Sequence, residues 1–306
     1  MNLQDLIVIS PEVQSAISNN KPVVALESTI ITHGMPWPEN LETAKRVENT
    51  IYDEGVTPAT IAVVGHKIRV GLSAEELLSL AQTKDVRKLS RADIAHALVC
   101  GDTGSTTVAA TMLCAHLAGI QVFATGGLGG VHRDVIETMD VSADLGEFER
   151  TPVLVVCAGV KAILDIAKTL EKLETLGIPV VAYNQDTFPA FWSSDSGLKA
   201  PLRMNTPEAI ARLVQTRKTL GQNEGVIVAN PVAPEDEILK QEMEPVIAQA
   251  LSEAKQKSIT GKAITPFLLQ RIFELTNGKS LATNIALVES NARLASKIAV
   301  QLAKRS

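Results

Sequence analysis

Aromatic residues are scarce in this chain of 306 residues, because phenylalanine, tryptophan and tyrosine together make up only 3% of it. The core must therefore consist mainly of alanine, valine, leucine and isoleucine, a composition that suits parallel strands covered by alanine-rich helices. Basic residues are also in deficit: 29 lysines and arginines face 34 acidic residues, and the net charge is −5. Without a basic field to hold a long phosphate backbone we expect no nucleic-acid partner, although one local pocket can still bind a single phosphate.

Cysteine is rare as well, and the three that occur are Cys100, Cys114 and Cys157. Their number is odd and no pair has the spacing of metal ligands, so we expect buried free thiols in a reducing compartment. No stretch approaches the roughly 20 apolar residues of a membrane span. The first residues, MNLQDLIVISPEV, lack the basic start and long apolar run of a targeting segment. We therefore expect a cytoplasmic protein without a membrane partner.

Short apolar runs alternate with helical patterns along the first 230 residues. Runs that predict buried strands lie at 22–26, 60–65, 121–127, 153–159, 179–183 and 225–230. Patterns that predict helices lie at 38–54, 73–82, 105–119, 160–174 and 206–220. This alternation predicts βαβ units, and hence an α/β fold with a mostly parallel central sheet flanked by helices.

Beyond Pro234 the pattern becomes purely helical, with helices predicted over 235–256, 264–276 and 280–304. We expect this helical C-terminal region to be a cap or an oligomer contact. No linker rich in glycine, proline or serine separates it from the rest, so residues 1–306 are predicted to form a single α/β domain. Residues 184–204 are polar and without clear period, which favours a mobile loop near the site.

Two charged residues follow predicted strands, at the sheet edge where ligands of open parallel sheets bind. Glu27 follows the run 22–26, and Lys161 follows the run 153–159. A charge in such a place is costly to bury unless it is paired, so each side chain points either to solvent or into a cleft. Glu27 is thus either an exposed strand end or a general acid or base. For Lys161 the pattern alone favours a solvated lysine. The alternative is a lysine at a helix start, where the helix dipole disfavours the charged ammonium form. The neutral amine that results could attack a carbonyl as a nucleophile.

Asp140 and Asp144 lie four residues apart. In a helix they would share one face and could hold a hard divalent cation together with water. The alternative, which the sequence pattern slightly favours, is that Ser142 caps a helix and Asp144 lies in its first turn.

The run GDTGSTTV at 101–108 places glycines and hydroxyls before a predicted helix, which favours an anion site. It lacks the lysine of a P-loop, so a nucleoside triphosphate is not indicated. His33 and His132 lie beside glycines in predicted loops and could contact a ligand, whereas the other three histidines are expected to be structural. The residues alone therefore predict an α/β enzyme with a small anionic ligand, and they do not name its substrate.

Six longer strings carry more information than their pattern: VVALESTIITHGMPWPEN, GSTTVAATM, FATGGLGGVHR, DVSADL, VCAGVKAILD and TPFLLQRIFELTNGKSLATNIALVESNA. In order and at similar spacing, from about residue 8 onward, the chain resembles the pseudouridine-5′-phosphate glycosidases. The resemblance implies a reversible, water-dependent cleavage of the C–C glycosidic bond of pseudouridine 5′-phosphate to ribose 5-phosphate and uracil, in pseudouridine catabolism. It also implies a homotrimer with an α/β fold and one Mn²⁺ per subunit, for which Mg²⁺ could substitute.

Matched motif by motif, the resemblance also implies residue roles. Glu27 would be the proton donor, Lys161 the nucleophile that forms an imine with the opened ribose, and Asp140 the metal ligand. Asp144 would assist ring opening and contact the substrate. The remaining implied substrate contacts are Lys88, Thr107, Val108, His132, Ser142, Ala143 and Asn284.

Two other classes of function stay open. A Schiff-base lyase of aldolase type, acting on a sugar phosphate, would share Lys161 and the phosphate site, and release of uracil separates the two. A non-enzymatic nucleotide-binding module would have no reason to bury Glu27 and Lys161 in one cleft. A sugar kinase is disfavoured because the chain has no glycine-rich loop with a phosphate-binding lysine.

Overall fold

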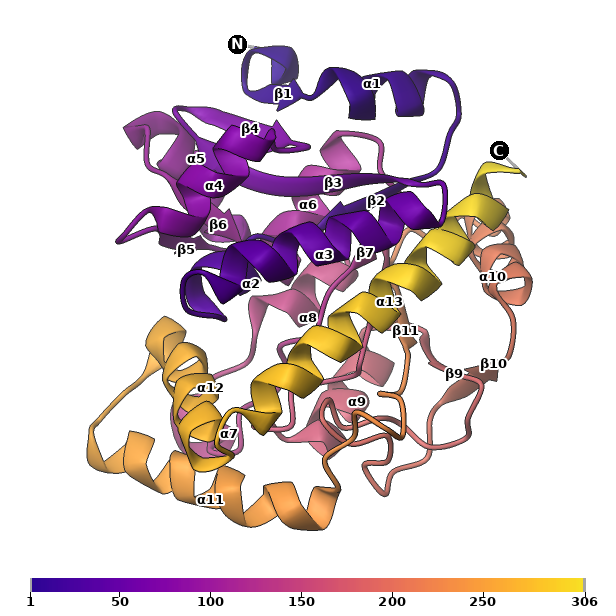
Figure 1. Ribbon diagram of the computed structural model, residues 1–306. Helices are drawn as coiled ribbons and strands as arrows, with labels where there is room; N and C mark the ends of the chain where they lie inside the picture. The colour runs from indigo at the N-terminus through magenta and orange to yellow at the C-terminus, as the bar shows by residue number, and fades with distance from the viewer. Residues whose placement is uncertain (1, 305–306) are drawn as a thin grey trace.

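The computed structural model describes residues 2–304. Within that range the strands join in an 11-stranded sheet of order β1-β4-β3-β2-β7-β8-β11-β9-β10, with β6 also paired to β3 and β5 paired to β6 (Figure 1). The strands are β1 (Ile7–Ile9), β2 (Val23–Leu26), β3 (Thr57–Val64), β4 (Lys67–Val70), β5 (Arg87–Leu89), β6 (Gly104–Thr106), β7 (Val122–Ala124), β8 (Leu154–Cys157), β9 (Val180–Tyr183), β10 (Leu202–Met204) and β11 (Val226–Ala229).

The sheet is mostly parallel, as the alternating pattern predicted. From β3 through β2, β7, β8, β11 and β9 to β10 all neighbours run parallel, while β3 pairs antiparallel with β4 and β6. The central strands β2, β8 and β11 consist entirely of buried residues. Continuous apolar runs of this kind are typical of parallel strands that are covered on both faces.

Helices flank the sheet and dominate the last quarter of the chain. The helices are η1 (Leu3–Asp5), α1 (Pro11–Ser18), α2 (Thr29–His33), α3 (Glu39–Asp53), α4 (Ala74–Gln82), α5 (Arg91–Cys100), α6 (Val108–Leu117), α7 (Val135–Thr138), α8 (Ala143–Phe148), α9 (Ile166–Thr175), α10 (Pro207–Thr219), α11 (Lys240–Gln256), η2 (Gly261–Ala263), α12 (Ile264–Leu275) and α13 (Lys279–Ala303). No helix within residues 2–304 is long and apolar enough to cross a bilayer.

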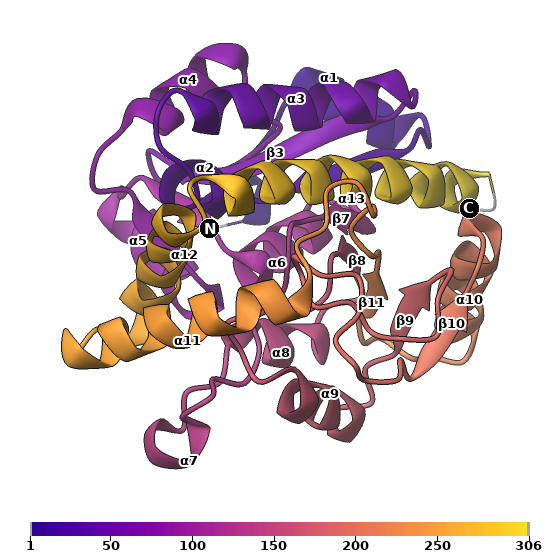
Figure 2. The same cartoon turned by 60° about the horizontal axis from the view of Figure 1, so that its bottom comes forward.

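The long helix α13 is part of the core and not a peripheral cap. It packs against β2, β7 and β8 and lies along α3 and α10 (Figure 1). Its inward residues, among them Leu287, Asn291 and Ala295, are fully buried. By contrast α11 and α12 pack on each other at the end of the molecule where α13 begins (Figure 2). The expected cap thus corresponds to α11 and α12, which we call the C-terminal cover (residues 240–275).

Three predicted helices begin later than expected. The helix predicted from 235 starts as α11 at Lys240. The segment predicted as a helix from 105 opens with β6, and α6 starts only at Val108. The segment predicted as a helix from 160 opens with turns, and α9 starts at Ile166 because the Asp165 side chain caps it by accepting the Lys168 amide at 3.0 Å. Lys161 therefore does not lie at a helix start, and the argument from the helix dipole does not apply to it.

Two further expectations were wrong in part. Cys114 and Cys157 are buried free thiols as expected, and burial raises the pKa of each to about 12, but Cys100 is exposed at the end of α5. The segment 184–204 is irregular apart from β10, yet its middle is packed: Phe188, Phe191 and Trp192 are buried. The sequence pattern suggested a polar mobile loop because serines and glycines there outnumber these few large side chains.

Candidate active site

A cleft of about 550 Å³ lies at the carboxyl ends of the central parallel strands. One side of it is lined by residues from the segments that follow neighbouring strands: Glu27 after β2, Gly126 and Gly127 after β7, and Lys161 after β8. Residues of α12 and α13 form the opposite wall, namely Thr265, Pro266, Leu269, Asn284, Leu287 and Val288. The cleft thus lies where ligands of open α/β sheets bind.

Glu27 is buried at the base of this cleft, with 9% of its surface exposed. The Thr125 hydroxyl donates a hydrogen bond to its Oε1. Burial raises the pKa of Glu27, and the nearby Lys161 and the Thr125 hydrogen bond only partly oppose that effect. A shift in this direction favours the protonated carboxyl, the form that a general acid needs. The alternative of an exposed strand end is therefore wrong.

Lys88 and Lys161 line the same cleft as Glu27. Within residues 2–304, neither ammonium group has a hydrogen-bond or ion-pair partner. Burial lowers the pKa of Lys88 to about 8, and the positive charge of Lys161 adds to this effect. Two close lysines without a partner favour an anionic ligand, because a bound anion would compensate both charges.

The backbone before Lys161 is fixed by long-range contacts. Gly159 has φ +87°, which favours glycine, and a Cβ there would lie 2.5 Å from the Pro189 carbonyl oxygen. The Lys161 amide then donates to the Leu128 carbonyl at 3.0 Å. These contacts, and not a helix, direct the lysine into the cleft.

Two glycines of the run GGLGG are required by close packing. A Cβ on Gly127 would lie 2.5 Å from the Phe191 ring, and a Cβ on Gly129 would lie 2.2 Å from the Ser142 hydroxyl oxygen. Close packing therefore explains these glycines without a role in dinucleotide binding. It lets the loop after β7 pass between the segment that contains Phe191 and the start of α8.

Asp144 and Ser142 form the capping arrangement that was the alternative to a cation site. Ser142 is the N-cap of α8, and its hydroxyl accepts the Asp144 amide at 3.2 Å. The buried Asp144 carboxylate accepts the Ala109 amide and the Gly129 amide, each at 2.9 Å. Because Asp140 lies before α8 begins, the two aspartates do not share a helix face, so a cation held between them on one face of a helix is not supported.

Asp140 instead lies beside His132. The His132 Nε2 is 3.8 Å from Asp140 Oδ2, and 36% of the Asp140 side chain is exposed. Neither residue lines the cleft. A single accessible carboxylate with an adjacent imidazole fits a cation that keeps most of its ligands as water, which is how Mg²⁺ and similar hard ions are commonly bound.

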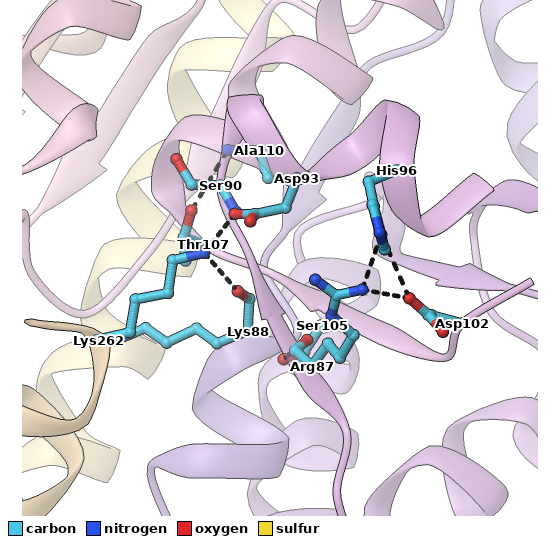
Figure 3. A network of polar contacts seen from close by, with 10 residues as sticks. All are labelled: Arg87, Lys88, Ser90, Asp93, His96, Asp102, Ser105, Thr107, Ala110 and Lys262. Atoms are coloured by element: carbon cyan, nitrogen blue, oxygen red, sulfur yellow. Dashed lines mark hydrogen bonds and ion pairs between the residues drawn. The ribbon is translucent and has the colours of Figure 1, made fainter. Parts of the chain in front are cut away.

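Another part of the molecule brings metal-binding residue types closer together. Within residues 2–304, the side chains of His96, Cys100 and Asp102 offer ligand atoms that all lie within 4.8 Å of one another. Arg87 is hydrogen-bonded to His96 and ion-paired with Asp102, so a cation already occupies this position (Figure 3). This group does not contain Asp140 and does not line the cleft.

Of the other expected substrate contacts, Asn284 lines the cleft, whereas Thr107, Val108, Ser142, Ala143 and Asp144 do not. Asn284 lines it, and its Oδ1 accepts the Trp192 indole N–H at 2.7 Å, which leaves the amide N–H groups for a ligand. Thr107 caps α6 and Val108 is its buried first residue, so Val108 can offer only its backbone N–H. Ala143 is exposed at the start of α8 and does not line the cleft.

Three residues in or beside the cleft were not predicted from the sequence. Thr125 donates a hydrogen bond to Glu27, and Phe191 and Leu269 form apolar parts of the cleft wall. Of these, Thr125 could have been identified from the sequence, since it directly follows strand β7 as Glu27 directly follows β2. His33 was expected to contact a ligand, and it does line the cleft; burial, aided by Lys88, lowers its pKa and keeps the imidazole neutral.

A parallel sheet with a buried acid and two lysines at its carboxyl edge defines an α/β enzyme for a small anionic substrate. Comparison with known proteins is more specific. Residues 12–301 match the family described as indigoidine synthase A like protein. A pseudouridine-5′-phosphate glycosidase from Paracoccus denitrificans is 61% identical over 300 residues, which cover 97% of this chain and 99% of that protein. The same enzyme from Geobacillus kaustophilus is 52% identical over 300 residues, covering 98% of this chain and all of that protein. The chain therefore belongs to the family of indigoidine synthase A like proteins, together with these glycosidases.

Solved structures agree with this assignment. The prealnumycin C-glycosynthase AlnA in complex with ribulose 5-phosphate superposes with a TM-score of 0.91 at 36% identity, covering 98% of both chains. An indigoidine synthase A-like protein from Thermotoga maritima superposes with a TM-score of 0.89 at 35% identity, covering 97% of both chains. The resemblance inferred from the six motifs is thus confirmed, as is the α/β fold.

Proposed function

We propose that this chain is a pseudouridine-5′-phosphate glycosidase, which cleaves the C–C glycosidic bond of pseudouridine 5′-phosphate to ribose 5-phosphate and uracil. The observation that carries the proposal is that Glu27, Lys88 and Lys161 line one cleft in a chain that is 61% identical to an enzyme of that name. The structural neighbour is in complex with ribulose 5-phosphate, which supports a pentose phosphate as a ligand of this chain.

The proposed chemistry explains why a lysine is needed in place of a second carboxylate. Ordinary glycosidases break C–O bonds with two carboxyl groups, but here the leaving atom is the C5 carbon of uracil. In our proposal the Lys161 amine forms a bond to ribose C1′ while the C1′–O4′ bond breaks and O4′ takes up a proton. The nitrogen lone pair then forms a C=N bond as the C1′–C5 bond breaks, and water hydrolyses this imine to release ribose 5-phosphate.

Glu27 is the proposed acid that protonates uracil C5 during this cleavage. Its burial and raised pKa support that role because they favour the protonated form that a general acid needs. Asp144 is the proposed helper in ring opening. Since both of its oxygens accept backbone amides, it would act mainly by orienting the glycine loop and the start of α6 and less by moving a proton itself.

A divalent cation is part of the proposal. Asp140, with His132 beside it, would hold Mn²⁺ or Mg²⁺ near the start of α8. When bound, such an ion supplies Lewis-acid polarisation and water molecules of lowered pKa. The proposed phosphate site consists of Lys88 and the amides at the start of α6, including that of Val108, because helix N-termini bind anions.

The experiment that tests the function is chromatography of the products formed from pseudouridine 5′-phosphate with Mn²⁺. Release of free uracil together with ribose 5-phosphate supports the proposal, whereas an aldol-type cleavage of the sugar with uracil still attached would favour the aldolase-type lyase. The single-domain organisation, a homotrimer and a cytoplasmic location are also proposed from the family resemblance. Light scattering during gel filtration tests the trimer.

A further inference from the structure

A lysine from the C-terminal cover reaches the rim of the proposed phosphate site. Lys262 lies in η2, immediately before α12, whose residues Thr265 and Leu269 line the cleft. Its ammonium group pairs with the Asp93 carboxylate and lies 3.4 Å from the carbonyl oxygen of Lys88 (Figure 3). The segment around residue 262 and the segment around residue 88 are thus joined across 174 residues of sequence by one cationic side chain.

Lys88, Lys161 and Lys262 bring three positive charges close together. The pKa of Lys88 is lowered to about 8 by burial, by Lys161 and, to a smaller extent, by Lys262 itself. Asp144 and Glu27 act in the opposite direction, and the Asp144 carboxylate also accepts two backbone amides. A dianion such as a phosphate monoester would pair favourably with these lysines.

The partner of Lys262 can release it at little cost. Asp93 also accepts the Ser90 amide at 2.8 Å, so its carboxylate keeps a hydrogen bond at the start of α5 when the lysine leaves. The Lys262 side chain is 58% exposed and that of Asp93 is 19% exposed, so water reaches the ammonium group and screens the pair. Its flexible stem lets the ammonium move while the backbone of η2 stays in place.

We propose that Lys262 is a second phosphate-binding cation, which exchanges Asp93 for the 5′-phosphate of the substrate and so draws the C-terminal cover onto phosphorylated substrates only. This inference rests on the proposed function and deepens it, because it names the residue by which the cover recognises the phosphate. Lys88 and Lys262 would then contact the phosphate from the sheet side and from the cover side.

The test compares Lys262→Met with the matched control Lys279→Met. Lys279 lies just beyond the same cover and forms an exposed pair with Glu242, and it is not among the charges that shift the pKa of Lys88. We expect Lys262→Met to lower kcat/KM for pseudouridine 5′-phosphate by roughly 10- to 100-fold, the loss of one charged hydrogen bond. Cleavage of unphosphorylated pseudouridine should not change, and the control should match wild type with both substrates.

A second variant separates phosphate binding from a merely structural pairing. Asp93→Asn keeps an acceptor for the Ser90 amide but removes the charge that holds Lys262. If Lys262 serves the phosphate, this variant should bind ribose 5-phosphate at least as tightly as wild type in calorimetry. If Lys262 only fastens the cover to α5, Asp93→Asn and Lys262→Met should lose activity alike, and equally with both substrates; that result overturns the inference.

Calorimetry with ribose 5-phosphate and ribose also makes the two failures distinguishable. A wild-type protein that releases no uracil but binds ribose 5-phosphate through Lys262 refutes the proposed function and keeps the phosphate contact. A wild-type protein that releases uracil while Lys262→Met keeps its full preference for ribose 5-phosphate over ribose refutes the contact alone.

Discussion

Replacing Lys88 by methionine should stabilise the ligand-free protein while it weakens the binding of sugar phosphates. The pKa of Lys88 falls from the ordinary 10.5 to about 8 in the folded protein. A pKa difference of about 2.5 corresponds to roughly 3 kcal/mol, at about 1.4 kcal/mol for each pKa unit. Methionine keeps most of the apolar stem and removes the charge, so we expect the free energy of unfolding at pH 7 to rise by about 1–3 kcal/mol.

The pH dependence gives this prediction its sign. A lysine whose pKa is lowered on folding binds fewer protons in the folded state than in the unfolded state between pH 8 and 10.5. The stability of the wild type should therefore rise with pH across this window relative to Lys88→Met. The difference between the two proteins should be constant below about pH 8 and shrink to under about 1 kcal/mol at pH 10.

Urea denaturation of both proteins at pH 7 and pH 10 measures this difference. Ribose 5-phosphate added at pH 7 should stabilise the wild type more than the variant, because a ligand stabilises the state that binds it. Two results would contradict the prediction: a variant that is less stable than the wild type at pH 7, or a stability difference that does not shrink toward pH 10. Either would show that the charge of Lys88 does not destabilise the ligand-free protein.

Three further substitutions test the remaining roles. Glu27→Gln should lower kcat for uracil release by at least about 100-fold. The wild-type kcat should decline as pH rises through the raised pKa of Glu27, and this decline should be absent in the variant. An unchanged pH profile in the variant would contradict the role of Glu27 as the acid. Lys161→Arg should still bind ribose 5-phosphate but form no adduct on borohydride reduction, since a guanidinium makes no imine; an adduct on another lysine of the wild type overturns the assignment. EDTA should reversibly abolish turnover, and Asp140→Asn should need more Mn²⁺ for half-maximal activity, so full activity of metal-free protein would exclude the cation.

The sequence predicted the central strands and the edge at which the cleft lies, because long apolar runs such as β2, β8 and β11 have no other stable place than a covered sheet. It missed β1, β4, β5, β6 and β10, since each has only three or four residues and none forms a long, continuously buried apolar run. It placed Lys161 at a helix start because residues 160–174 have helical spacing. The turn there is fixed by contacts with Leu128 and Val131, which lie about 33 residues away in the sequence.

The roles of Glu27 and Lys161 could be named from motifs, but their burial could not. From the pattern alone Glu27 was as compatible with solvent as with a cleft and a solvated Lys161 was favoured, because exposure depends on what covers the strand ends. That cover comes from α12 and α13, which lie more than 100 residues further along the chain than Lys161. Lys262 had no signal at all, since a single lysine between two helices is ordinarily solvated.

The position of α13 has a consequence for how the protein is made. Every strand of the sheet precedes α13 in the chain, yet α13 packs on the central strands β2, β7 and β8 and contributes a wall of the cleft. During synthesis on the ribosome one apolar face of the finished sheet must wait for this helix to emerge. A nascent chain that stalls before residue 279 should therefore need chaperone protection and be sensitive to proteases, and it cannot bind substrate until α13 has docked.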